Sequence, residues 1–371
     1  ILILKTKLFC LWIVGLFLNS MAMHQIKSHT IHVSFTNFLV NFARAGKITC
    51  PGFFYVNMKI LIFGAGAVGG YFGGKLFISG FDVTFLVRAS RKKKLLATGL
   101  KIFSPHGDFS ADVKCKTVAE SAEIYDLVLL CCKAYQLENA IKDLKDFLKK
   151  PPFILPVLNG LSHIGELQTH FGKDKVFGGT AHIASTVSEE GYIKQLNPIQ
   201  VLTAGCISDN QGADILNEFI DACNTANFKA MMVEDIMQSM WDKWSFLATL
   251  AGSTVLFRNS VGAITDNSLG AELMLRMYKE CLDVADASGH KVSNKAEKKA
   301  LGILMEPGSD FTASMLRDLL AGAPTEHEHI LGELVKTGKQ FDIDMPLISA
   351  AYVSAFAENS DFRSGLLDVR S

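Results

Sequence analysis

The chain has 371 residues, of which 49% are hydrophobic and 20% charged, a composition typical of a globular protein and not of a disordered one. Its 37 basic and 37 acidic side chains balance, so no global basic field favours nucleic acid as a partner. The length exceeds what one compact core usually organises, and we therefore expect two domains.

The cysteine and histidine pattern argues against a metal site. Eight cysteines are scattered without a C-x-x-C pair or a Cys/His cluster at metal-ligand spacing. His327 and His329 are two residues apart and would not share a helix face. Cys131 and Cys132 lie in an apolar run and are interpreted as buried thiols. Reduced cysteines fit a cytoplasmic protein, which is the localisation that we expect.

The first 57 residues differ from the rest of the chain. Lys5 and Lys7 precede an apolar stretch over 8–18, which resembles a signal peptide but is shorter than the roughly 20 apolar residues of a membrane-spanning helix. Met58 opens a regular strand and looks like a natural protein start. A non-native leader, a targeting segment and a structural extension all stay open for residues 1–57, and we expect this segment to lie outside the fold.

From Met58 onward, short apolar runs alternate with helical segments, an alternation typical of a doubly wound parallel sheet. Strands that follow one another over 180–207 without long helices predict an antiparallel extension of that sheet. The other expected strands are 60–63, 83–87, 127–132, 153–158 and 228–233, and the expected helices between them are 64–79 and 136–149.

After Glu234 long helical patterns dominate. We therefore predict an α/β fold in which an N-terminal Rossmann-type domain over 58–233 is followed by an all-α catalytic and substrate domain over 234–371. The expected helices of the second domain are 235–256, 269–288, 294–304, 311–320, 327–341 and 347–359.

A glycine-rich loop with the pattern G-x-G-x-x-G directly follows the first strand and opens a helix. Gly64 would permit the tight turn, Gly66 would let a pyrophosphate approach the backbone, and Gly69 would let the helix pack close to the strand. Free N–H groups and the helix dipole favour anions at this N-terminus. We therefore predict a dinucleotide site formed by Gly64, Ala65, Gly66, Ala67, Val68 and Gly69.

The end of the second strand indicates which dinucleotide binds. An NAD-binding protein usually has an acidic residue about 20 residues after the loop, whereas here Arg88 and the basic residues 91–94 follow the strand. A guanidinium can bind a 2′-phosphate through two hydrogen bonds, and an acid would repel it. We therefore predict NADP(H) as the cofactor with Arg88 as its clamp, and we interpret Lys93 and Lys94 as solvated helix residues.

These and later motifs resemble those of the ketopantoate reductase (2-dehydropantoate 2-reductase) family. The resemblance covers about residues 58–360. It rests on GAGAVGGYFGG at 64–74, FLVR ending at Arg88, CKAYQ at 132–136, LNG at 158–160, MWDKW at 240–244, TASMLRD at 312–318 and PTEHEHILGEL at 324–334.

The resemblance implies binding roles for four residues. Lys133 and Gln136 would line the cofactor crevice. Asn159 would lie near the nicotinamide ribose and the substrate, and Ser314 would bind the substrate carboxylate. Asn159 also follows an expected parallel strand, at the edge of the sheet where ligands of such folds bind. A packed helix serine is the structural alternative for Ser314.

The resemblance also implies that Lys243 is the catalytic lysine and that Glu326 supports the active site. Hydride addition to a ketone builds negative charge on oxygen, which an ammonium can stabilise and then protonate. A nearby carboxylate could orient that ammonium and tune its pKa. A surface lysine at 243, and at 326 a first-turn helix acid after Pro324, are the structural alternatives.

Three positions depart from the family pattern, because Leu247, Ala251 and Val261 stand where asparagines are usual. The polar groups that would bind the hydroxyl and carbonyl of ketopantoate are therefore mostly missing. Each substrate group left without a hydrogen-bond partner would cost about 1–3 kcal/mol of binding free energy. A less polar 2-keto acid would suit such a pocket better. Thr249 or Ser253, on the same helix, could compensate for the lost asparagines.

The function that we expect is NADPH-dependent reduction of a 2-keto acid, foremost of ketopantoate to pantoate in pantothenate biosynthesis. One alternative is a reductase of the same family that acts on another, less polar 2-keto or 3-hydroxy acid. Another is a non-catalytic NADP(H)-binding sensor. We expect the small acid as partner, no nucleic acid and no membrane beyond the leader. The apolar C-terminal helices could form either a homodimer interface or a core.

Overall fold

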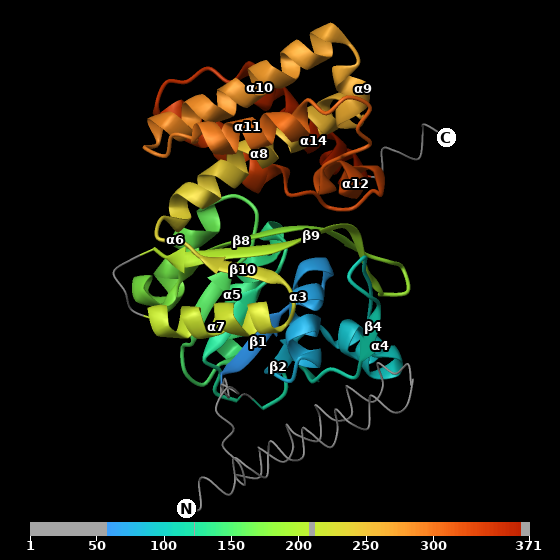
Figure 1. Cartoon of the computed structure of the whole chain (residues 1–371), viewed down its shortest axis with the longest axis vertical. Helices are drawn as coiled ribbons and strands as arrows, with labels where there is room; N and C mark the ends of the chain where they lie inside the picture. The colour runs from blue at the N-terminus through green and yellow to red at the C-terminus, as the bar shows by residue number, and fades with distance from the viewer. Residues whose placement is uncertain (1–57, 122, 208–211, 365–371) are drawn as a thin grey trace, which may run out of the picture. The chain divides into compact units, whose positions relative to one another are not determined.

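The computed structural model describes residues 58–121, 123–207 and 212–364 (Figure 1). The interpretations of residues 1–57 therefore lie outside the described residues. All described residues belong to one unit, 56–371. Among them, no helix combines the length and the apolar character that crossing a membrane requires.

Five parallel strands form the first sheet, in the order β5-β2-β1-β6-β7. The chain leaves β1 on one side to form β2 and later returns to form β6 on the other side, so the strand order reverses at β1. Ligands of open α/β sheets bind at such a switch point. The strands are β1 (Lys59–Phe63), β2 (Asp82–Leu86), β5 (Cys115–Lys116), β6 (Leu127–Leu130) and β7 (Phe153–Pro156).

Helices on either side of these strands complete the Rossmann-type arrangement that the sequence predicts. The middle strands are mostly apolar and buried, as in a sheet covered on both faces; all four residues of β6 are buried. The helices are α3 (Ala67–Ile78), α4 (Ala89–Thr98), η1 (Ala134–Gln136), α5 (Leu137–Phe147), α6 (Ser162–Phe171) and η2 (Lys173–Lys175).

A second sheet lies on the other side of α3, in the order β10-β9-β3-β4 with β8 paired to β9. The expected antiparallel pairing over 180–207 is confirmed by β8 and β9, but the expectation that this pair extends the first sheet is wrong. The strands are β3 (Leu100–Phe103), β4 (Phe109–Ala111), β8 (Phe177–Val187), β9 (Ile193–Cys206) and β10 (Lys229–Met232), with α7 (Ala213–Thr225) before β10.

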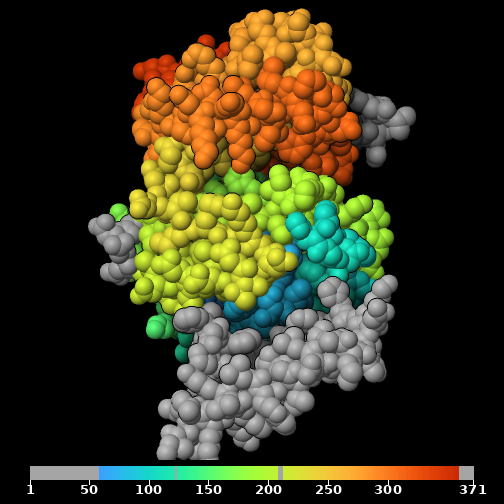
Figure 2. Space-filling view, in the orientation of Figure 1, coloured from blue at the N-terminus to red at the C-terminus, as the bar shows by residue number. Residues whose placement is uncertain are grey.

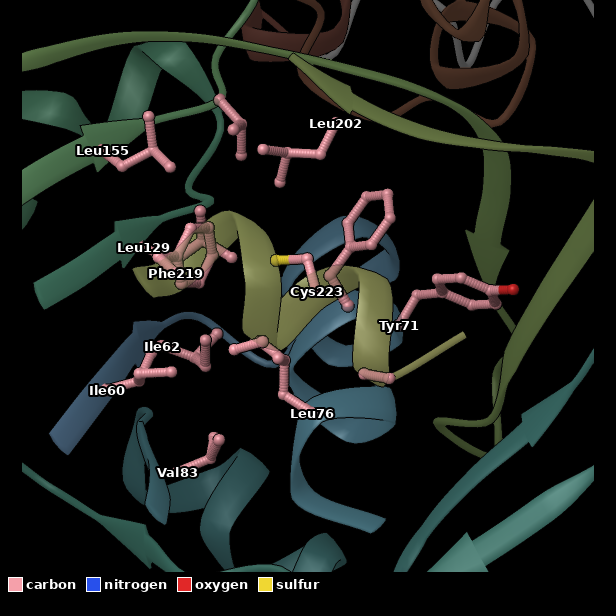
Figure 3. Packing of buried hydrophobic residues seen from close by; sticks show 14 of the residues in the cluster. Ile60, Ile62, Tyr71, Leu76, Val83, Leu129, Leu155, Leu202, Phe219 and Cys223 are labelled. Atoms are coloured by element: carbon pink, nitrogen blue, oxygen red, sulfur yellow. The ribbon is translucent and has the colours of Figure 1, made fainter. Parts of the chain in front are cut away.

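The glycines of α3 explain why two sheets can flank one helix. A Cβ on Gly73 would lie 2.7 Å from Cγ1 of Ile62 in the first sheet, and a Cβ on Gly70 would lie 2.2 Å from Cδ1 of Ile193 in the second. Close packing therefore requires glycine at both positions. Figure 3 shows side chains from both sheets, from α3 and from α7 meeting in one core, among them Ile60, Ile62, Leu76, Leu202 and Phe219.

Beyond β10 the described chain is helical, and α8 runs out of the sheet region into a group of helices that surrounds it (Figure 1). The last strand ends at Met232 and α8 begins at Ile236, on either side of the boundary that we expect near residue 234. The helices are α8 (Ile236–Phe257), α9 (Val261–Thr265), α10 (Ser268–Ala287), α11 (Asn294–Leu304), α12 (Ser314–Leu320), the π-helix η3 (Glu328–Gly332), α13 (Glu333–Gln340) and α14 (Pro346–Ser364).

Side-chain caps precede four of these helices; the starts of α8, α10 and α11 lie close to the predicted ones, whereas the short helix α9 was not predicted. Asp235, Ser260, Asn267 and Ser293 each accept a hydrogen bond from a backbone N–H of the helix that follows. α8 packs against α10, α12 and α14, and its buried apolar residues from Trp241 onward join the core of the helical region. On the surface, the residues of α10 to α14 form a continuous orange-to-red area in Figure 2.

The close packing of α3 gives a stability prediction. We expect Gly73→Ala to lower the free energy of unfolding by about 1–3 kcal/mol, because the added methyl would lie under 3 Å from Ile62 and Phe85. Gly302→Ala in α11 is the matched control, since its Cβ would meet nothing within 4 Å; it should stabilise by up to about 1 kcal/mol. Urea unfolding measures both, and equal stability of Gly73→Ala and the wild type would contradict the packing.

Candidate active site

Lys243 lies in the second turn of α8 and reaches the end of the parallel sheet. Its Nζ donates a hydrogen bond to Oδ1 of Asn159, at 3.3 Å, in the loop after β7. The neighbouring Trp244 is buried, and its indole Nε1 donates to the carbonyl oxygen of Ile330 at 2.9 Å. The indole thus attaches α8 to the π-helix η3 and fixes the turn that carries Lys243.

Asn159 is placed by a turn that requires glycine at the next position. Gly160 has φ +79°, and a Cβ there would lie 2.6 Å from the carbonyl oxygen of His329 in η3. The Nδ2 of Asn159 donates to Oε2 of Glu326 at 3.4 Å while its Oδ1 accepts from Lys243. These two partners require opposite ends of the amide, so together they fix its orientation.

Glu326 is a buried carboxylate, 6% exposed, that precedes η3 in the helical region. Its partners come from the Rossmann-type region. Oε1 accepts from the backbone N–H of Ala134 at 3.1 Å, and Oε2 accepts from Nζ of Lys133 at 3.2 Å as well as from Asn159. A carboxylate can be buried at tolerable cost when it is paired and hydrogen-bonded in this way.

Lys133 links two carboxylates of the helical region, because its Nζ also lies 2.9 Å from Oδ2 of Asp318 in α12. Burial lowers the pKa of Lys133, but Glu326 and Asp318 together outweigh burial and hold that pKa above its usual range. Lys133 therefore stays a cation at any physiological pH. In this structure it pairs with both Asp318 and Glu326.

Lys243 differs from Lys133 in its proton affinity. Burial lowers the pKa of Lys243 to about 8, and the negative charge of Glu326 raises it only in part. An amine with a pKa near the working pH can both hold and release a proton, which is the property that general acid–base catalysis needs.

The nearby histidines are poor competitors for that role. Burial, together with the charges of His329 and Lys243, lowers the pKa of His163 to about 3. Burial and the charges of Lys243 and Lys299 lower the pKa of His182 to about 3 as well. Both imidazoles are therefore neutral at physiological pH, whereas the pKa of Lys243 is about 8.

A small cavity of about 10 Å³ borders Lys243. Of the three departures from the family pattern, Leu247 lines this cavity, whereas Ala251 and Val261 are fully buried in the helical core. The lining residues are Leu158, Asn159, Gly160, Thr180, Met240, Lys243, Trp244 and Leu247.

The expectation that Thr249 or Ser253 compensates for the missing asparagines is wrong. Both side chains are fully buried within the helical region. The hydroxyl of Thr249 donates to the carbonyl oxygen of Ser245 at 2.9 Å, and that of Ser253 donates to the carbonyl oxygen of Thr249 at 2.6 Å. Such hydroxyls bond back to their own helix, as serine and threonine commonly do in helix interiors.

The glycine loop has the geometry of a phosphate site. Gly64 has φ +95°, which favours glycine. A Cβ on Gly69 would lie 2.3 Å from the carbonyl oxygen of Gly64, so glycine is needed there for close packing. A Cβ on Gly66 would meet nothing within 4 Å, which leaves the N-terminus of α3 open to a ligand. Ala65 is buried beneath the loop, and Ala67 and Val68 form the first turn of α3.

Arg88 is exposed at the start of α4, and within the described ranges its guanidinium makes no hydrogen bond or ion pair. The neighbouring Arg91 is used structurally, because it donates to the carbonyl oxygens of Ala65 at 3.1 Å and Gly191 at 2.7 Å. Lys92 pairs with Glu120. Arg88 is therefore the arginine of this segment that is available to a ligand.

The remaining candidates lie near the same edge of the sheet. Gln136 is half-buried and ends η1, the short helix that begins after Lys133. Ser314 is half-buried and begins α12, one helical turn before Asp318, which binds Lys133. Asp318 was not among the sequence-based candidates, although its position four residues after Ser314 puts both on one helix face.

Comparison with known proteins identifies the family. Residues 60–209 match the family described as ketopantoate reductase PanE/ApbA, and residues 235–355 match its C-terminal domain. An uncharacterized oxidoreductase YkpB from Bacillus subtilis is 30% identical over 297 residues, which cover 80% of this chain and 97% of that protein. The chain belongs to the ketopantoate reductase family. It is an oxidoreductase of that family.

Further similar proteins match at lower sequence identity. A 2-dehydropantoate 2-reductase from Aquifex aeolicus is 26% identical over 294 residues, 78% of this chain and 93% of that protein. A ketopantoate reductase structure from Ralstonia eutropha has a TM-score of 0.74 at 21% identity and covers 82% of this chain and 100% of that one. D-mandelate dehydrogenase with NADH and anilino(oxo)acetate has a TM-score of 0.75 at 21% identity and the same coverage. These two structures support the fold alone.

The two lysines should titrate at different pH values. We expect the ¹³Cε resonance of Lys243, assigned by its loss in Lys243→Met, to titrate near pH 8. The resonance of Lys133 should not titrate below about pH 10, the region in which an ordinary lysine loses its proton. Glu326→Gln should lower the pKa of Lys243 further, because it removes the charge that favours the ammonium. Titration of Lys243 near pH 10.5, like an exposed lysine, would contradict the burial that we describe.

Proposed function

We propose that the protein reduces a 2-keto acid with NADPH, and that Lys243 protonates the oxygen that becomes the new hydroxyl. The observation that carries the proposal is the amine of Lys243, with a pKa of about 8, hydrogen-bonded to Asn159 at the carboxyl edge of the parallel sheet. The alternative of a non-catalytic NADP(H)-binding sensor gives no role to a lysine whose pKa is lowered to about 8 near the buried Glu326.

The residues present fit a dinucleotide. Gly66 leaves the N-terminus of α3 open, and the N–H groups and dipole of that helix would hold the pyrophosphate. Gly64 and Gly69 would shape the loop, while Lys133 and Gln136 would border the crevice. When bound, the reduced nicotinamide supplies the hydride. Arg88 would bind the 2′-phosphate, which makes NADPH the preferred form.

The polar residues around Lys243 prepare it to act as an acid. Asn159 accepts a hydrogen bond from its ammonium and so directs it. Glu326 favours the protonated form through its charge, and Lys133 holds Glu326 in place. As negative charge develops on the substrate oxygen, the Lys243 ammonium stabilises it more strongly than it stabilises the neutral ketone, and then transfers its proton.

Ketopantoate is the first substrate candidate, because the family is named for its reduction; its product, pantoate, would place the protein in pantothenate biosynthesis. A second candidate is a 2-keto or 3-hydroxy acid with a less polar side chain. Leu247 favours it, since this residue lines the cavity beside Lys243 together with Met240 and Trp244. Ser314 would donate to the carboxylate of either acid.

A panel of keto acids tests the proposal. We expect oxidation of NADPH with at least one member of a panel that contains ketopantoate and 2-keto acids with branched or aromatic side chains. Lys243→Met should lower kcat by about 10²- to 10⁴-fold, while NADPH still binds as judged by its fluorescence. For the wild type, kcat/KM for reduction should fall by about tenfold per pH unit above pH 8, where Lys243 loses its proton.

The relative rates across the panel decide between the two substrate candidates. A Lys243→Met variant as fast as the wild type would contradict the role of the lysine. NADPH binding without turnover of any keto acid would favour the sensor.

Cofactor preference is tested at Arg88. We expect Arg88→Ala to raise KM for NADPH by about tenfold or more and to leave KM for NADH nearly unchanged, because only NADPH carries the 2′-phosphate. Lys93→Ala is the control for a general effect of positive charge in the same helix. An equal KM for NADPH in Arg88→Ala and Lys93→Ala would argue against a specific clamp.

A further inference from the structure

Thr180 is a buried hydroxyl residue beside the candidate active site. It lies in β8, is 3% exposed, and lines the same cavity as Lys243 and Asn159. Its Oγ1 is buried and has no hydrogen-bond partner among the described residues. Buried polar groups are nearly always hydrogen-bonded, so an unpaired one at the wall of a cavity points to a ligand atom as its partner.

The alternation of β8 explains how Thr180 comes to line the same cavity as Lys243. Gly178, two residues earlier on the same face of the strand, lies against α8, since a Cβ there would be 2.8 Å from Ile236 and 3.2 Å from Sδ of Met240. The missing side chain lets α8 approach the strand. Thr180, two residues further along β8 on the same face, therefore lies next to the following turn of α8, which carries Lys243.

Two residues that carry hydrogen-bond donors, Thr180 and Lys243, line the same small cavity. The ammonium of Lys243 has three N–H donors, and Asn159 accepts one of them. The cavity measures about 10 Å³, close to the volume that a single oxygen-sized group needs. Thr180 on a strand and Lys243 on a helix both line this space.

We propose that Thr180 is a second donor to the keto oxygen of the substrate, acting together with Lys243. This inference rests on the proposed function. As the hydride adds to the carbonyl carbon, the C=O π electrons move onto oxygen; Lys243 gives that oxygen its proton, and Thr180 donates a hydrogen bond but keeps its own proton. Such a donor stabilises the charged oxygen more than the neutral ketone, so it should act on kcat more than on KM.

Thr180→Val, which replaces the hydroxyl by a methyl group of similar size, tests the proposal. We expect kcat to fall by about 10²-fold, as when one donor to a developing oxyanion is removed, with KM for the keto acid within about threefold of the wild type. The melting temperature should stay the same or rise, because the variant no longer buries an unpaired hydroxyl. Thr180→Ser keeps the hydroxyl and should recover most of the activity.

A control variant and a pH profile separate this role from a structural one. Thr203→Val changes a buried threonine that pairs with Thr180 on the neighbouring strand β9 but does not line the cavity, and it should leave kcat unchanged. The pH profile of kcat/KM in Thr180→Val should keep its decline above pH 8, because Lys243 is still present.

Three results would overturn the inference: wild-type kcat in Thr180→Val, a Thr180→Ser variant as slow as Thr180→Val, or a displaced pH profile, which would mean that the hydroxyl acts on Lys243. The wild type and Lys243→Met are assayed in parallel. If the wild type reduces keto acids and Thr180→Val does so equally well, this inference fails while the proposed function stands. If the wild type reduces none of them, the proposed function itself fails.

Discussion

The site depends on one buried carboxylate whose partners belong to another part of the chain. Glu326 precedes the π-helix of the helical region, yet it accepts hydrogen bonds from Ala134, Lys133 and Asn159, which follow the parallel strands β6 and β7. Leaving a buried carboxylate without partners costs several kcal/mol. The helical region is therefore constrained to pack where Glu326 meets these donors, and that packing also brings Lys243 to Asn159.

The two lysines of this hydrogen-bond network have pKa values shifted in opposite directions because their surroundings differ. Lys133 lies between two carboxylates and stays a cation, so it acts as a permanent counter-charge. Lys243 is half-buried beside a neutral amide, and its proton is held loosely enough to be given away near neutral pH. Lys133 can thus maintain the geometry while Lys243 carries a proton. Proteins commonly tune the pKa values of identical side chains through their surroundings in this way.

Local patterns were sufficient to predict the features in which one short segment determines the outcome. The glycine loop between β1 and α3 is such a case, and the start of α8 at the Asp235 cap is another. The second sheet was not predictable in the same way, because a strand pattern does not say which neighbour the strand will pair with; that depends on the glycines on both faces of α3.

Asp318 and Thr180 were missed because an acid in a helix and a threonine in a strand are ordinary until the fold places them beside a lysine. Lys243 itself was identified through its family motif and not through any local period.

The most direct test of the account is a crystal structure of the protein with NADP⁺ and the 2-hydroxy acid that corresponds to its best keto acid. The distance that matters joins Nζ of Lys243 to the hydroxyl oxygen of the bound acid, on the side of the nicotinamide ring. We predict about 2.6–3.2 Å, the range of a hydrogen bond through which a proton can be transferred. A Lys243 side chain that points into bulk solvent, away from the nicotinamide, would contradict the account.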